Sequence, residues 1–190
     1  AREMPSGVYD PRWLPARTPQ GEVQALAFTL SRRSEALMGR LDDAQMLQQL
    51  VQNLSPESRY FRFISSMVQL PASMLARFTL IDYDREMALV ALFRERTVGA
   101  DGEIKETDRI VGVSRYVTNP DQSSCEFALV VADDFNGKGL GSRLMLSIMD
   151  VARDKGLAEI DGLVLANNPG MLKLMRSLGF EVKAYAEDPD

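Results

Sequence analysis

The stretch that most constrains the fold of this chain is residues 130–146, VVADDFNGKGLGSRLML. It begins as an apolar run typical of a buried strand, breaks at two aspartates, and enters a turn that contains Gly137, Gly139 and Gly141. Apolar residues then recur at helical spacing, at Leu140, Leu144, Ile148 and Val151. The stretch therefore predicts a strand, a glycine-rich turn and a helix in direct succession.

The alternating glycines favour a turn that binds an anion. Glycine lets the backbone approach a ligand closely, and the amides at a helix N-terminus favour a phosphate group. Lys138 and Arg143 add positive charge, while Asp133 and Asp134 are expected to cap the turn. There is no GKS or GKT ending, and the glycines follow G-x-G-x-G instead of G-x-G-x-x-G. A pyrophosphate site is predicted, but a site for a nucleoside triphosphate is not.

Composition excludes several kinds of chemistry. The 190 residues include one cysteine and no histidine, so an internal disulfide, a Ser-His-Asp triad and a His-ligated metal are impossible and no metal site is predicted. The net charge of −5 gives no indication of nucleic-acid binding. No apolar run is long enough to span a membrane, and no signal-peptide pattern opens the chain. We expect a soluble, cytoplasmic domain in which carboxylates, tyrosine, lysine and cysteine supply any acid–base chemistry.

The order of the segments predicts a single mixed domain. Residues 1–21 are rich in proline and glycine and are expected to be a linker, so that residues 22–190 form one domain excised from a longer protein. Residues 23–30 and 35–41 each fit a strand, a helix fits parts of this region nearly as well, and we favour the strand at 35–41. Strands are predicted at residues 87–93, 110–117, 125–132, 160–166 and 180–185, and helices at 42–53, from 56 through SRYFRFIS, at 71–78, 139–155 and 169–178. Residues 98–109 are expected to be a polar loop.

Two segments carry a resemblance to a known family. Residues 136–141, NGKGLG, resemble the Q/R-x-x-G-x-G/A signature of the GCN5-related N-acetyltransferases (GNAT), with Asn136 where Gln or Arg is usual. Residues 167–180, NNPGMLKLMRSLGF, resemble the second cofactor segment of that family, N-x-x-x-x-x-L-x-x-x-L-G-F. The resemblance implies acetyl-CoA as cofactor, an α/β (α+β) fold with a mixed sheet of six to seven mostly antiparallel strands, and helices on both faces. The chain ends at AEDPD, so a last strand is expected to be missing or supplied by a partner molecule.

The family also implies which residues hold the cofactor. The turn residues would bind the pyrophosphate, Asn167 would contact the pantetheine, and unpaired amides of a splayed strand would bind pantetheine and polarise the thioester carbonyl. The residues concerned are Val130, Val131, Ala132, Asn136, Gly137, Lys138, Gly139, Leu140, Gly141, Ser142, Arg143 and Asn167.

A narrower resemblance covers about residues 40–190. SPESRYFRF, LIDYDREMALVAL and SCEFALVVADD resemble the acetyltransferase domain that closes the bacterial protein acetyltransferases of the Pat type. In those proteins the domain follows an acyl-CoA-synthetase-like region, acetylates a lysine of AMP-forming acyl-CoA synthetases and inactivates them. The resemblance implies the same fused region and the same kind of protein substrate here.

Acetylation of a lysine demands a base, because deprotonating an amine of pKa near 10.4 at pH 7.4 costs about 4 kcal/mol. We predict Glu126, at the position where Pat-type proteins have their catalytic glutamate. By strand alternation it points with Ala128 and Val130, and its apolar neighbours should partly withdraw it from water. The alternative is a glutamate that pairs with an arginine or faces solvent.

Other assignments stay open. The family often protonates the departing thiolate with a tyrosine, but Met175 stands at that position, and spacing does not rank Tyr60, Tyr83 and Tyr116 as substitutes. Cys125 invites a mechanism through an acetyl-cysteine, although a lone cysteine in an apolar strand is usually just buried. The alternatives to a protein acetyltransferase are an enzyme for a small amine and a non-catalytic acyl-CoA sensor.

Overall fold

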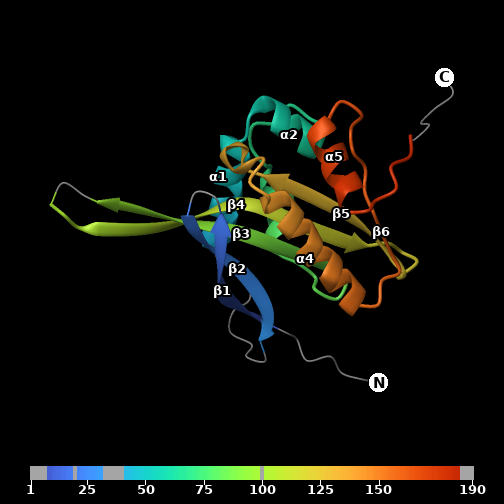
Figure 1. Cartoon of the computed structure of the whole chain (residues 1–190), viewed down its shortest axis with the longest axis horizontal. Coiled ribbons are helices and arrows are strands. Elements are labelled where there is room, and N and C mark those ends of the chain that lie inside the picture. The colour runs from blue at the N-terminus through green and yellow to red at the C-terminus, as the bar shows by residue number, and fades with distance from the viewer. Residues whose placement is uncertain (1–7, 19–20, 32–40, 99–100, 185–190) are drawn as a thin grey trace.

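The computed structural model describes residues 8–18, 21–31, 41–98 and 101–184 (Figure 1). In this part of the chain, five α-helices accompany a mixed four-stranded sheet of order β3-β4-β5-β6, and β1 and β2 form a separate antiparallel pair. The elements are β1 (Val8–Thr18), β2 (Gly21–Ser31), α1 (Leu41–Asn53), α2 (Pro56–Phe63), α3 (Ala72–Thr79), β3 (Glu86–Val98), β4 (Ile104–Thr118), β5 (Ser124–Val131), the 3-10 helix η1 (Asp133–Phe135), α4 (Leu140–Asp154), β6 (Glu159–Asp161) and α5 (Pro169–Ser177).

The sheet changes from antiparallel to parallel next to the glycine turn. β3, β4 and β5 are antiparallel neighbours, as short hairpin connections require, whereas β6 pairs with β5 in parallel after the crossover through α4. This combination of mostly antiparallel strands with one parallel pair is the mixed sheet that the sequence predicts. A single sheet of six to seven strands is not confirmed, because the main sheet has four strands among the described residues.

Helices cover both faces of the sheet. On one face α4 lies close to β4: the buried Ser114 donates its Oγ hydrogen to the carbonyl of Leu144 at 3.1 Å, and a Cβ on Gly112 would lie 2.8 Å from Leu144 Cδ1. On the other face the buried Arg115 donates to Glu86 at 2.6 Å and its guanidinium lies 4.7 Å from the centre of the Phe78 ring of α3. The hydrophobic core therefore lies on both sides of β4 and β5.

The β3–β4 hairpin is longer than the sequence predicts. The strands continue through most of the expected loop at residues 98–109, and the hairpin extends from the sheet as an arm (Figure 1). Cross-strand ion pairs hold the register of the arm: Arg94 donates to Asp108 at 2.8 Å, and Arg96 donates to Glu106 at 2.6 Å. Charged cross-strand pairs can stabilise a strand pair that has no apolar alternation.

Other boundaries also differ from prediction. Within the segment expected to be an extended linker, residues 8–18 form β1, an edge strand, where prolines are tolerated. The assignment of residues 35–41 falls outside the described residues except for residue 41, the first of α1. β6 ends at residue 161 instead of 166, and residues 180–184 of the predicted last strand are not in a strand. β6 stops where Gly162 passes so close to Phe127 that a Cβ would lie 2.7 Å from its ring.

Candidate functional site

The turn between β5 and α4 has the backbone conformation that only glycine adopts readily. Gly137 and Gly139 have φ angles of 71° and 81°, and Gly139 is the N-cap residue of α4. A Cβ on either residue would have no heavy atom within 4 Å, so both face open space. Gly141 serves packing instead, because a Cβ there would lie 3.2 Å from Leu174 of α5. The turn thus exposes backbone next to the N-terminus of a long helix, an arrangement suited to a phosphate anion.

Among the described residues, one edge of β5 is left unpaired beside this turn. β6 pairs with β5 only as far as Glu126 and Asp161, whereas β5 continues to Val131. The amide of Ala132 donates to the carbonyl of Val111 in β4 at 2.9 Å, so strand alternation directs the amides of Leu129 and Val131 to the open edge. The sequence predicts free amides at three residues. The amide of Val131 points to the open edge, as predicted. The amide of Ala132 is bonded to β4, and strand alternation directs the amide of Val130 to β4 as well.

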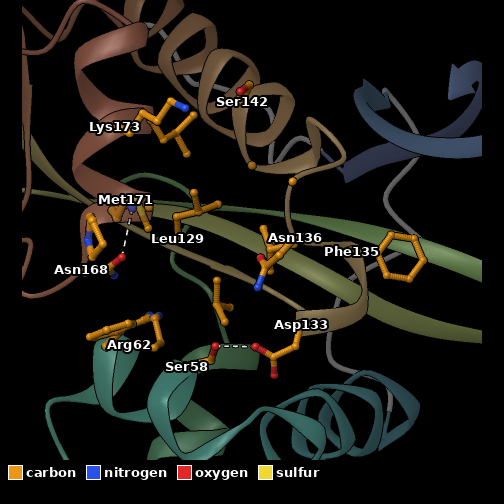
Figure 2. A pocket seen from close by; sticks show the side chains of 18 of the residues that line it. Ser58, Arg62, Leu129, Asp133, Phe135, Asn136, Ser142, Asn168, Met171 and Lys173 are labelled. Atoms are coloured by element: carbon orange, nitrogen blue, oxygen red, sulfur yellow. Dashed lines mark hydrogen bonds between the residues drawn. The ribbon is translucent and has the colours of Figure 1, made fainter. Parts of the chain in front are cut away.

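A cleft of about 740 Å³ joins the turn, the end of β5 and the N-termini of α2 and α5 (Figure 2). The predicted residues that line it are Val130, Val131, Asn136, Gly137, Gly139, Gly141 and Ser142. Those that do not line it are Glu126, Ala132, Lys138, Leu140, Arg143 and Asn167. The exposed Lys138 lies over the Phe135 ring with Nζ 5.1 Å from the ring centre, beside the cleft mouth.

The second cofactor segment, residues 167–180, lines the cleft with residues other than the predicted Asn167. Asn168, not Asn167, lines the cleft, and its Oδ1 accepts a hydrogen bond from the amide of Met171 at 3.0 Å, which caps α5. The motif itself contains this signal, because the N-x-x-x-x-x-L spacing counted back from Leu174 ends at Asn168. Lys173, which sequence reasoning missed, lines the cleft from α5 opposite Ser142 of α4 (Figure 2). It adds a positive charge to the walls.

Glu126 lies outside the lining of the cleft, on β5, the strand that α2 contacts. Its side chain is exposed, so the expectation that it is partly withdrawn from water is wrong. Arg62 of α2 lines the cleft nearby. Burial and the like charge of Arg115 lower the pKa of Arg62 to about 10, and the carboxylate of Glu126 acts in the opposite direction. Glu126 and Arg62 are therefore within electrostatic reach of each other.

Residues 65–180 match the model of the Acetyltransferase (GNAT) family. The chain belongs to this family. It is 36% identical over 151 residues to the acetyltransferase PA5475 of Pseudomonas aeruginosa, a match that covers 80% of this chain and 75% of that protein. It is 32% identical over 126 residues to the acetyltransferase Pat of Mycolicibacterium smegmatis, covering 66% of this chain and 34% of the length of that relative.

The fold has a corresponding solved structure. The crystal structure of the GNAT domain of S. lividans PAT matches with a TM-score of 0.70 and 25% identity, over 93% of this chain and 92% of that one. Family membership makes this chain a GNAT acetyltransferase, and GNAT acetyltransferases use acetyl-CoA as acyl donor. The residues present fit that donor: the two positive-φ glycines leave open space for a diphosphate, and the open β5 edge leaves amides for an extended chain. In the described part of the chain no helix is both long and apolar enough to cross a membrane.

The remaining candidates for GNAT chemistry lie away from the cleft. Cys125 is fully buried on the face of β5 opposite Glu126, and burial, together with the charge of Asp161, raises the pKa of its thiol to about 11. Its thiolate, the nucleophilic form, is therefore scarce near neutral pH. None of Tyr60, Tyr83 and Tyr116 is among the residues that line the cleft. Met175, at the position of the family tyrosine, is buried with 3% of its surface exposed.

Proposed function

We propose that this domain transfers the acetyl group of acetyl-CoA to the Nε of a lysine in another protein, an AMP-forming acyl-CoA synthetase that is inactivated by the modification. The observation that carries the proposal is the continuity of the cleft: it runs from the glycine turn along the end of β5 to Arg62 of α2, the residue on which the charge of Glu126 acts. The 32% identity to Pat and the match to the GNAT domain of S. lividans PAT favour a protein acceptor.

The donor side of the cleft is built for an anionic, extended molecule. Amides of the turn at Gly137, Gly139 and Gly141 would hold the diphosphate together with Ser142 and the charge of Lys173. Leu129 and Val131 would bind the pantetheine through their amides at the open edge. An amide at this edge would also polarise the thioester carbonyl of acetyl-CoA. Acetyl-CoA supplies the thioester, whose C–S bond breaks as the lysine nitrogen bonds to the carbonyl carbon.

The acceptor side requires a group that removes a proton from the lysine ammonium. Glu126 is the base in this proposal, and its exposure suits a macromolecular substrate, because a lysine of a second protein can reach it from solvent. Direct attack is favoured over an acetyl-cysteine because Cys125 is buried on the opposite face. The leaving sulfur takes its proton from the attacking amine or from water, since no tyrosine lines the cleft among the described residues.

The test is acetylation of a purified AMP-forming acyl-CoA synthetase, followed by mass spectrometry of its lysines. We expect acetyl-lysine with the unmodified domain and a rate about 10²- to 10⁴-fold lower with Glu126→Gln, the range typical of a lost general base. Glu159→Gln is the matched control, because Glu159 is an exposed carboxylate on β6 that lies opposite Ser124, not opposite Glu126. Equal activity of the two variants would remove Glu126 from the role of base.

An acyl-CoA sensor without catalysis is the alternative from a different class. It is favoured by Met175, which fills the position of the family tyrosine with a side chain that cannot donate a proton. The same assay separates the two functions. Binding of acetyl-CoA with no acetyl-lysine on the synthetase and no acetylation of free lysine would favour the sensor, whereas acetylation of free lysine alone would indicate a small-amine enzyme.

A further inference from the structure

The N-terminus of α2 is capped by a residue far away in the sequence. Ser55 is the N-cap residue, and its Oγ accepts from the amide of Ser58 at 3.2 Å. In a local capping box, a Glu or Gln three residues after the cap would reach back to the cap amide. Ser58 holds that position and is too short to do so.

Asp133 of η1 takes over this role from 78 positions away. Its carboxylate accepts from the Ser55 amide at 2.6 Å, from the Ser58 hydroxyl at 2.5 Å and from the Ser55 hydroxyl at 3.3 Å. Figure 2 shows the bond between Asp133 and Ser58 across the cleft. The sequence-based expectation that Asp133 caps the glycine turn is therefore wrong in part: its carboxylate caps α2 instead.

Apart from this tie to Asp133, α2 is placed by Arg59, which donates to the carbonyl of Leu54 at 2.6 Å, and by the Arg62 guanidinium, which lies 5.8 Å from the centre of the Phe78 ring of α3. Helix α2 has eight residues, too few to be stable alone, and none of its side chains is fully buried. Its C-terminal half carries Arg62, which lines the same cleft as Asp133 and lies within electrostatic reach of Glu126. A small rotation of α2 would thus move the guanidinium relative to the proposed base.

We propose that Asp133 is a positioning residue for acetyl transfer: by tying the start of α2 to the segment that precedes the glycine turn, it sets where Arg62 stands on the acceptor side of the cleft. The proposal rests on the proposed function, since it assigns that side of the cleft to the lysine-bearing protein. If Asp133 acts in this way, loss of its hydrogen bonds to α2 weakens binding of the acceptor protein. Binding of acetyl-CoA is not weakened, because the residues proposed to bind it lie on β5, the glycine turn, α4 and α5.

The experiment compares Asp133→Ala with Asp134→Ala in the domain, using acetyl-CoA and a purified AMP-forming acyl-CoA synthetase. Asp134 is a matched control because its carboxylate pairs with Arg109 at 2.5 Å and does not line the cleft. For Asp133→Ala we expect the KM for the synthetase to rise about tenfold, the scale of a lost charge-assisted hydrogen bond. The Kd for acetyl-CoA should stay the same or decrease, since a carboxylate beside a diphosphate is removed.

A second variant separates positioning from simple helix capping. Asp133→Ala combined with Ser58→Glu restores a local capping box on α2 without restoring the tie to η1. We expect the double variant to recover thermal stability and to keep the raised KM for the synthetase. If the double variant recovers both the thermal stability and the original KM for the synthetase, the inference is overturned. It is also overturned if Asp133→Ala and Asp134→Ala have the same KM. Absence of acetyl-lysine with the unmodified domain would instead overturn the proposed function on which it rests.

Discussion

Replacing Gly139 by alanine isolates the contribution of the glycine turn to donor binding. A φ of 81° costs a non-glycine residue about 1–2 kcal/mol, and no neighbouring atom lies within 4 Å to add a steric contribution. If the turn of the variant keeps its shape, the free energy of unfolding falls by this amount of about 1–2 kcal/mol, and the new methyl group projects into the cleft. If the turn relaxes, binding must restore the conformation, and the same 1–2 kcal/mol appears as a Kd that is about 5- to 30-fold higher.

Gly156 provides the control for this prediction. It follows the C-terminus of the same helix, has a φ of 79°, and a Cβ there would also have no neighbour within 4 Å. Gly156→Ala should therefore lower stability by about 1–2 kcal/mol and leave acetyl-CoA binding unchanged. Urea unfolding measures the stability of both variants, and titration calorimetry with coenzyme A measures their affinity. If Gly139→Ala binds coenzyme A as tightly as Gly156→Ala, the turn is not the diphosphate site.

Two further substitutions test the surroundings of β5. Cys125→Ala should retain acetyl transfer, measured with the synthetase assay. Because folding raises the pKa of Cys125 from 9.0 to about 11, the thiol stabilises the fold below pH 9, and this contribution disappears as the pH rises toward 11. Between pH 9 and 11 the free energy of unfolding should decline less for Cys125→Ala than for the unmodified domain. An equal decline would contradict the raised pKa of the thiol. Gly162→Ala should lower the free energy of unfolding by about 1–3 kcal/mol, because its Cβ would lie 2.7 Å from the Phe127 ring, and unchanged stability in urea would refute that contact.

The turn and its helix could be predicted from the sequence because they depend on local rules. Only glycine adopts the backbone conformation at positions 137 and 139 without strain, so the spacing of the glycines predicts the turn. The strand alternation of β5 likewise predicts that Cys125 and Glu126 face opposite sides. The mixed sheet follows from short hairpins on one side of β5 and a helical crossover on the other.

The features that could not be predicted depend on distant parts of the chain. The exposure of Glu126 depends on how much of its face of β5 is covered by α2, a segment more than 60 positions earlier in the chain. The engagement of the Ala132 amide depends on its register with Val111. The cap that Asp133 places on α2 joins residues 78 positions apart, and neither segment alone indicates it.

A crystal structure of the domain with coenzyme A would show whether the glycine turn binds the diphosphate. We expect diphosphate oxygens about 3 Å from backbone nitrogens within residues 137–143, and a pantetheine along the open edge of β5 at Leu129 and Val131. The sulfur should lie at the end of the cleft nearest Glu126, on the acceptor side that α2 borders. Coenzyme A bound away from the glycine turn, or a sulfur that ends remote from Glu126, would contradict it.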